Sequence, residues 1–261
     1  MKPKNTWQWT ICGKHPVVKD YFQSGSDSTL LMAFCNWMDK GYRLLKDRRL
    51  IDPARLVSWR FWAKGIEENL IVCGIVKDSS DRIGRYYPIM FTGSGLLDDW
   101  KNQLDLLPFA LEKIWNQMDY LCSKRYNNYK NFKEEMFSIR SPEPSWQNFA
   151  QNRQELYESS ASSNVVVPWD IGKFRQKISQ LTQVPRLYAY IDQGMAANTL
   201  ITLGLWHTLL KDSLNHVPNS VFIGGTGDVI YLAVFINSLN ANDFVELWSD
   251  SNFELNNSKR K

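Results

Sequence analysis

The sequence predicts an α/β chain of the α+β type, with a mixed, mostly antiparallel sheet flanked by helices. Three β-branched or aromatic runs, at residues 58–62, 70–76 and 86–91, follow one another with only polar turns between them. This spacing is typical of an antiparallel meander. Helical patterns do not alternate regularly with the strands, so a doubly wound parallel sheet is not expected.

The first half is expected to open with a strand and a helix. Large and polar residues alternate over Trp7–Cys12, and Gly13–Pro16 then ends the strand in a turn. Ser26–Ser28 offers N-cap oxygens to a helix whose apolar residues recur at helical spacing as far as Leu45.

The meander and a second helix complete the first half. The middle run, 70–76, is expected in the centre of the sheet. Thr92–Gly95 lacks the spacing of a nucleophile elbow and is expected to end a strand. Asp98-Asp99 can begin the next helix, Pro108 limits or kinks it, and its apolar stripe runs over 107–121.

A change of composition marks an internal boundary. Residues 123–164 are rich in Asn, Lys, Glu, Ser and Gln. We therefore divide the chain into an N-terminal α/β region at 1–122, a polar helical and loop connector at 123–164, and a C-terminal α/β region at 165–261. We expect the two α/β regions to pack together as one domain.

The C-terminal region continues the mixture of helices and strands. Glycines can turn a hairpin there, and Asn242 can cap a short last helix. In chain order, the expected elements are a helix at 170–181, a strand at 187–191, a helix at 196–210, strands at 220–223 and 229–236 joined by Gly224–Asp228, and a helix through Trp248.

Composition excludes several classes of protein. The 261 residues carry 31 Lys and Arg against 27 Asp and Glu, and part of this small excess lies at 259–261, so the chain has no nucleic-acid footprint. The longest apolar runs reach about eight residues, far short of a membrane span. Eleven Trp residues fit an aromatic core and also a surface that docks on proteins.

The start of the chain and its cysteines indicate a cytoplasmic protein. Positively charged residues follow Met1, but the apolar segment that a secretory signal requires does not come after them. Cys12, Cys35, Cys73 and Cys122 stand far apart, each in an apolar segment. We expect four reduced core thiols.

Catalytic and metal-binding patterns are not found, and we expect no catalytic residue, metal or cofactor. Cys12 and His15 are close in sequence but straddle a strand end and a turn. His207 and His216 have no further ligand in register with them. The glycines of Gly224–Asp228 lack the Lys and Ser or Thr of a phosphate-binding loop, which favours a hairpin turn.

Two segments suit contact with a partner protein. Residues 13–22 and 81–88 combine charged and aromatic residues, and Arg and Tyr are frequent in interface hot spots. As ordinary structure, the first is a solvated connection and the second an Asx-type turn whose arginines are solvated or pair with Asp81. The candidate partner-binding residues are Lys14, Asp20, Tyr21, Arg82, Arg85 and Tyr86.

The order and spacing of these segments resemble the TagF family, also called ImpM, of type VI secretion system-associated proteins. A GKxPxxGDF-like loop, a W-R-F strand and an S-x-D-x-x-G-R-x-F/Y-P turn carry the resemblance, with Lys19 in place of the second loop Gly. The matching residues are Gly13, Lys14, Pro16, Asp20, Tyr21, Trp59, Arg60, Phe61, Ser79, Asp81, Gly84, Arg85, Tyr87 and Pro88. The resemblance covers residues 5–122 and, more loosely, 220–248.

The resemblance implies a cytoplasmic bacterial accessory protein that acts after translation, typically by restraining assembly or firing of the secretion apparatus. The implied partner is a forkhead-associated scaffold protein or another type VI secretion component. The implied function is regulation by binding, without enzymatic activity, nucleic acid or an integral membrane segment. Two alternatives stay open, a small ligand- or nucleotide-binding enzyme and a structural subunit of the same apparatus. The oligomeric state is not predicted.

Overall fold

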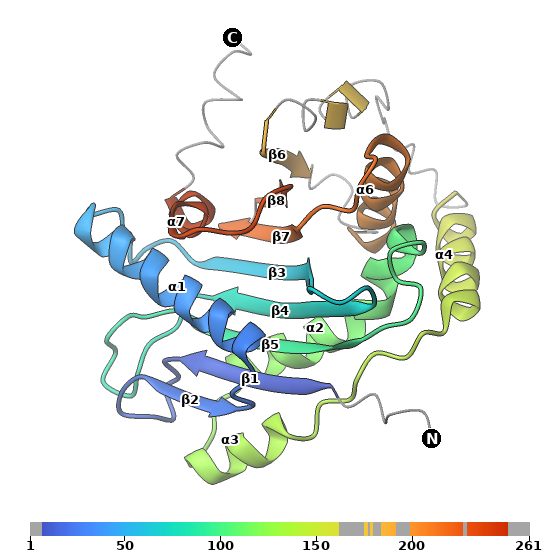
Figure 1. Cartoon of the computed structure of the whole chain (residues 1–261). Coiled ribbons are helices and arrows are strands. Elements are labelled where there is room, and N and C mark those ends of the chain that lie inside the picture. The colour runs from blue at the N-terminus through green and yellow to red at the C-terminus, as the bar shows by residue number, and fades with distance from the viewer. Residues whose placement is uncertain are drawn as a thin grey trace.

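The computed structural model describes residues 7–161, 175–176, 178–179, 184–191, 199–226 and 229–249. Strands and helices from both halves of the chain take part in the fold (Figure 1). The strands are β1 (Gln8–Gly13), β2 (Phe22–Gly25), β3 (Val57–Lys64), β4 (Leu70–Lys77), β5 (Ile89–Leu96), β6 (Arg186–Ile191), β7 (Ser220–Thr226) and β8 (Ile230–Phe235). The helices are α1 (Thr29–Asp47), the short 3-10 helix η1 (Leu104–Leu106), α2 (Leu107–Ser123), α3 (Tyr129–Met136), α4 (Trp146–Ala161), α6 (Thr199–Ser213) and α7 (Ala241–Ser249).

The strands form one eight-stranded sheet in the order β2-β1-β5-β4-β3-β7-β8-β6, and every strand pair described is antiparallel. The predicted α+β class is therefore confirmed. The predicted meander is the run β3-β4-β5, and β4 lies between its two neighbours as expected. Strand β3 also pairs with β7, from Val57↔Thr226 to Ala63↔Ser220.

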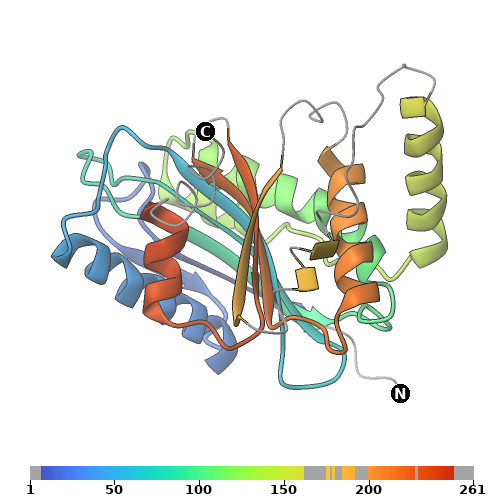
Figure 2. The ribbon, with the colours of Figure 1, turned by 90° about the horizontal axis from the view of Figure 1, so that it is seen from above.

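Helices cover both faces of the sheet. Helices α1 and α7 lie on one face, α2 and α6 lie on the other, and α4 lies outside α2 and α6 (Figure 2). Strand β3 shows how the faces are filled, because Trp59 and Phe61 point to the α1 side and Trp62 to the α2 side. Trp59 Nε1 donates to Leu247 O of α7 at 2.9 Å, and Trp62 Nε1 donates to His207 Nε2 of α6 at 2.9 Å.

Most of the tryptophans belong to the core. Among the tryptophans in the described part of the chain, those at positions 7, 37, 59, 62, 100, 115, 206 and 248 are buried. The aromatic excess is therefore explained chiefly by packing.

Several helix ends differ from the sequence prediction. Helix α1 begins as expected, since the Ser28 side chain accepts from Leu31 N. Pro108 stands in the first turn of α2, where its missing N–H costs nothing, so it starts the helix and does not kink it. The Asn240 side chain caps α7 by accepting from Asn242 N at 2.9 Å, so the prediction that Asn242 is the cap was wrong.

Two strand predictions also need correction. The prediction did not include β2, which pairs with β1 at the edge of the sheet. Strand β5 begins at Ile89 and not at residue 86, and it runs through Thr92–Gly95, the predicted strand end, to Leu96. A Cβ at Gly93 would lie 2.0 Å from the Trp9 ring, so the glycine makes room for an aromatic ring lying on the strand.

Other predictions fall on parts of the chain that are not described. Most of the helix expected at 170–181, the centre of the Gly224–Asp228 turn, the first six residues and the tail beyond Ser249 lie outside the described residues.

The expectation of four reduced thiols was wrong. Cys12 of β1 and Cys35 of α1 form a disulfide, and Cys73 and Cys122 are free and buried. Spacing in the sequence gave no sign of the pair, because the packing of α1 across β1 brings the two cysteines together. Burial raises the pKa of the Cys122 thiol to about 12, so this thiol stays protonated and unreactive in the fold.

We predict that the denatured protein, kept from reductant, presents two reactive thiols and that reduction raises the number to four. Because the cross-link closes a loop of 23 residues, Cys35→Ser is expected to lower the free energy of unfolding by about 3 kcal/mol. Thiol titration and urea denaturation measure the two effects. Four reactive thiols before reduction would show that the disulfide does not form.

The buried His207 predicts a loss of stability in acid. Burial lowers its pKa to about 4, although its hydrogen bond to Leu203 O partly opposes this shift. Between about pH 4 and 6.5 the unfolded chain binds more protons at this residue than the folded chain does, so stability falls as the pH is lowered through this window. The contribution of His207 amounts to at most about 3 kcal/mol.

Urea denaturation at pH 7, 5.5 and 4.5 tests this prediction. In His207→Gln the loss of stability in acid should be smaller than in the wild type, whereas His216→Gln, at an exposed position, should leave it unchanged. Equal pH dependence in all three proteins would contradict the assignment.

Candidate functional site

The two segments singled out in the sequence lie together at one end of the sheet (Figure 1). Residues 14–21 follow β1, and residues 78–88 connect β4 to β5. Since β1 and β5 pair with Gly13 opposite Ile89, the antiparallel register brings the loops side by side. Arg82 N donates to Val18 O at 2.8 Å across the junction.

Glycine at position 13 permits this close approach. Its φ is 122°, and a Cβ there would lie 2.1 Å from Pro88 O. The adjoining Lys14 N donates to the same carbonyl at 3.3 Å. Lys19, which stands where the resembled family has Gly, is not strained, because Arg49 and Asp99 are the only non-glycine residues with positive φ in the described part of the chain.

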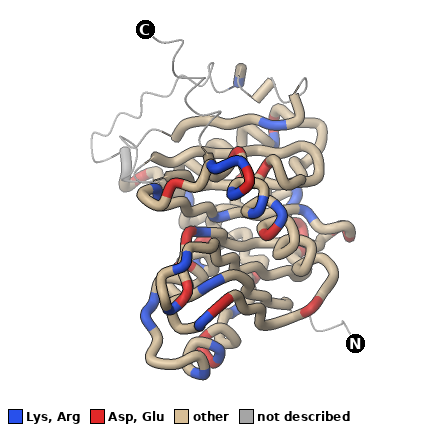
Figure 3. Tube along the Cα trace, turned by 90° about the vertical axis from the view of Figure 1, so that its left-hand side faces the viewer, with Lys and Arg blue, Asp and Glu red and all other residues tan. Residues whose placement is uncertain are grey.

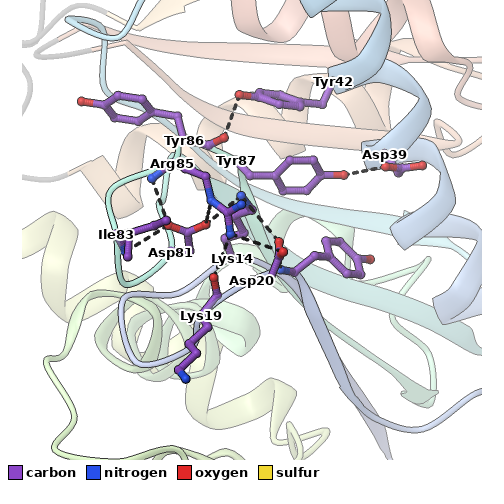
Figure 4. A network of polar contacts seen from close by, with 11 residues as sticks. Lys14, Lys19, Asp20, Asp39, Tyr42, Asp81, Ile83, Arg85, Tyr86 and Tyr87 are labelled. Atoms are coloured by element: carbon purple, nitrogen blue, oxygen red, sulfur yellow. Dashed lines mark hydrogen bonds and ion pairs between the residues drawn. The ribbon is translucent and has the colours of Figure 1, made fainter.

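The carboxylate of Asp81 is the hub of the site (Figure 4). Its side chain is fully buried, and Oδ2 accepts from Lys14 Nζ at 2.9 Å and from Arg85 Nε at 2.7 Å. Oδ1 accepts from the backbone N–H groups of Ile83 at 3.1 Å and Arg85 at 3.0 Å. One ionised group therefore shapes its own turn and ties that turn to the loop after β1.

The same contacts keep Asp81 ionised. Burial by itself would raise its pKa, but the hydrogen bonds from Lys14, Arg85 and Ile83 outweigh burial and hold the pKa far below its usual range. A buried carboxylate with two cations and two N–H donors is fully satisfied. These groups of the protein neutralise its charge, so the carboxylate is not available to bind a ligand.

Arg85 connects the hub to the exposed rim. Its guanidinium also donates to Lys19 O at 2.9 Å and pairs with Asp20 at 3.3 Å. The backbone N–H of Tyr21 and the charge of Arg85 lower the pKa of Asp20. Asp20 is two-thirds exposed, so these contacts with it are screened by water.

Tyrosines flank the network on the side of α1. Tyr87 donates to Asp39 of α1 at 2.7 Å, and the ring of Tyr21 packs edge-on against Tyr87. Tyr42 of α1 donates to the backbone carbonyl of Tyr86 at 3.3 Å. These contacts fix the base of the loop while the Tyr86 ring itself is 58 % exposed.

The structure thus divides the predicted site residues into two groups. Lys14 and Arg85 turn toward Asp81, as the Asx-turn reading allowed for Arg85, and Asp20 joins them from the rim. Arg82 and Tyr86 point outward, and Tyr21 is partly exposed. Sequence reasoning missed Ile83, which is 72 % exposed. An isoleucine at the tip of a polar turn was the available signal.

The residues considered for catalysis have structural roles in the fold. Cys12 is held in the disulfide, and His15 is buried with its ring stacked on Phe132 at 4.7 Å, so they do not form a thiolate–imidazole pair. His207 accepts from Trp62 and contacts Leu203 O, as a satisfied core histidine does.

The described residues contain no group of three or more His, Cys, Asp or Glu that could hold a metal ion. No helix among them is both long enough and apolar enough to cross a membrane.

We predict that Asp81→Asn loosens the loop junction while Asp20→Asn does not. Asparagine at position 81 keeps an acceptor but leaves Lys14 and Arg85 close together without their buried counter-charge. The melting temperature should fall by roughly 5 °C or more, and amides 82–86 should exchange faster with solvent. Asp20→Asn should shift the melting temperature by about 1 °C or less, because its pairs are exposed. Equal effects of the two changes would contradict the role of Asp81 as hub.

Comparison with known proteins supplies the family. The TagF N-terminal domain, type VI secretion system-associated, matches residues 10–138. No curated protein matches the chain. The crystal structure of PA0076 from Pseudomonas aeruginosa PAO1 is similar over 51 % of this chain, with 22 % identity and a TM-score of 0.39, and the chain spans 63 % of that protein's chain. Through residues 10–138, the chain belongs to the TagF N-terminal domain family of type VI secretion system-associated proteins.

Proposed function

We propose that this chain is a non-enzymatic accessory protein of the type VI secretion system that regulates assembly or firing after translation by binding a component of the system. The family match over residues 10–138 supports the association with the secretion system. The proposed partner is a forkhead-associated scaffold protein or another type VI component, and the proposed sign of the regulation is negative.

The observation that carries this proposal is the arrangement of the two loops at this end of the sheet. An ionised, fully satisfied Asp81 holds two loops rigidly, and the same turn presents Arg82 and Tyr86 to solvent. No ion pair or side-chain hydrogen bond of Arg82 occurs among the described residues, so its guanidinium is available to a carboxylate or phosphate. A rigid loop with an outward Arg and Tyr suits recognition of a protein.

We also propose that the regions before and after the connector act as one unit in the cytoplasm. The pairing of β3 with β7 supports the first point, because it joins strands of the two regions in one sheet. A cytoplasmic disulfide must resist reduction. Cys12 and Cys35 are 0 % and 2 % exposed, which shields their bond from thiols in solution.

The proposed function predicts capture of a type VI component through the outward residues. The tagged protein is used as bait in a cell that expresses the secretion system, and captured proteins are identified by mass spectrometry. Arg82→Ala/Tyr86→Ala should reduce capture by about tenfold or more at an unchanged melting temperature, because both side chains are exposed. Lys113→Ala/Phe137→Ala removes a cation and a similarly exposed ring elsewhere and should capture as the wild type does.

Each outcome decides a different part of the proposal. Undiminished capture by the Arg82/Tyr86 variant would refute the site but keep the function. Absence of every type VI component from the wild-type capture would refute the function.

A further inference from the structure

A pocket opens beside the loop junction, at the same end of the sheet. Its walls come from the end of α1, the loop that leads into β3, the β4–β5 loop and α7. Apolar and aromatic side chains make most of the surface, namely Tyr42, Ile51, Leu56, Tyr86 and Trp248. Tyr86 lines this sheet-end pocket and is also one of the two outward-pointing residues of the candidate site, with Arg82.

The polar groups of the sheet-end pocket are already paired. Asp78 accepts from Val57 N at 2.6 Å and from Trp248 Nε1 at 3.2 Å. Tyr42 donates to Tyr86 O, and Asp52 pairs with Arg55 at 3.7 Å. A polar ligand would have to displace these contacts, whereas an apolar side chain would only remove water from the walls.

Exposed apolar side chains stand on the loops that form the walls of the pocket. Leu56 is 73 % exposed, Ile83 is 72 % exposed, and Leu50 is also exposed. With Tyr86 they come from the two loops that flank the pocket. Such a group at one end of the molecule marks a protein-binding surface more than scattered exposed residues do.

The charges of the flanking loops that make no ion pair or hydrogen bond with an opposite charge are predominantly positive. Lys46, Arg48 and Arg49 lie at the end of α1, and Arg82 lies on the β4–β5 turn, against a single free acid, Asp47. Within the described residues none of these four cations makes an ion pair, and only Arg48 makes a side-chain hydrogen bond, to Asn242 Oδ1. Figure 3 faces this end of the molecule and shows basic positions on several loops, interspersed with acidic ones.

We infer that the sheet-end pocket binds an acidic segment of a type VI component that carries one protruding apolar side chain, such as Leu, Ile, Met or Phe. The apolar side chain packs against Leu56, Tyr86 and Trp248 at the mouth of the pocket, whose cavity volume is about 30 Å³, and carboxylates beside it face Arg49 and Arg82. Charge complementarity selects this partner over a basic one. The inference rests on the proposed function and adds the chemistry of the partner to it.

The test uses the full chain and the purified type VI component identified by capture, with affinities measured by calorimetry. Arg49→Glu/Arg82→Glu should weaken binding by about tenfold or more, and raising the salt from 50 to 300 mM should weaken wild-type binding severalfold. Leu56→Ser should weaken binding by about tenfold without changing the salt dependence. Both variants alter exposed side chains, so their melting temperatures should match the wild type.

Matched controls separate the pocket from general surface effects. Lys113→Glu reverses an exposed charge on α2, and Ile66→Ser truncates a side chain that is 98 % exposed on the β3–β4 turn, at the opposite end of β3. Both controls should bind within about twofold of the wild type.

Failure of the inference is distinguishable from failure of the proposed function. Capture of a type VI component whose affinity is unaffected by the two pocket variants and by salt would overturn the inference and leave the function standing. A wild-type homodimer that Leu56→Ser dissociates would also overturn it, since a second copy would then occupy the pocket. Capture of no type VI component would overturn both.

Discussion

Strand β3 is the element on which the rest of the structure depends. It pairs with β4 on one side and with β7 on the other, so it joins strands encoded before and after the connector. On each face of the strand one of its own tryptophans is buried and donates a hydrogen bond to a helix that covers that face. Its first residue, Val57, donates to Asp78 in the sheet-end pocket. The position of the β4–β5 loop, and with it the candidate site, follows from how β3 is held.

The site depends in turn on a single buried charge. Asp81 is separated from Lys14 by 67 residues, yet the two side chains are in direct contact. Several residues that carry the family resemblance, including Gly13, Lys14, Asp81 and Arg85, serve this junction and so build the platform. The exposed residues Arg82, Ile83 and Tyr86 lie on the same turn as Asp81 and Arg85. Residues that hold the junction and residues proposed to meet a partner are thus interleaved within a short segment.

Local patterns predicted much of the fold. The meander, the Ser28 cap of α1 and the β7–β8 hairpin strands follow from periodicity and capping, which act over a few residues. Strand β2 has four residues and no apolar alternation, so only its pairing with β1 defines it. The continuation of β5 through Gly93 depends on the Trp9 ring that lies over it, and no local signal reports a neighbour from another strand.

The sequence by itself determined the α+β class, most of the strands and helices, the family resemblance and the two segments that build the site. Only the tertiary structure decided that Cys12 meets Cys35, that Lys14 and Arg85 turn inward while Arg82 turns outward, and that a pocket opens beside them. The physical reason is the range of the interactions. Propensity, capping and turn chemistry act between near neighbours in the chain, whereas ion pairing, disulfide formation and burial join residues that strand register alone brings together.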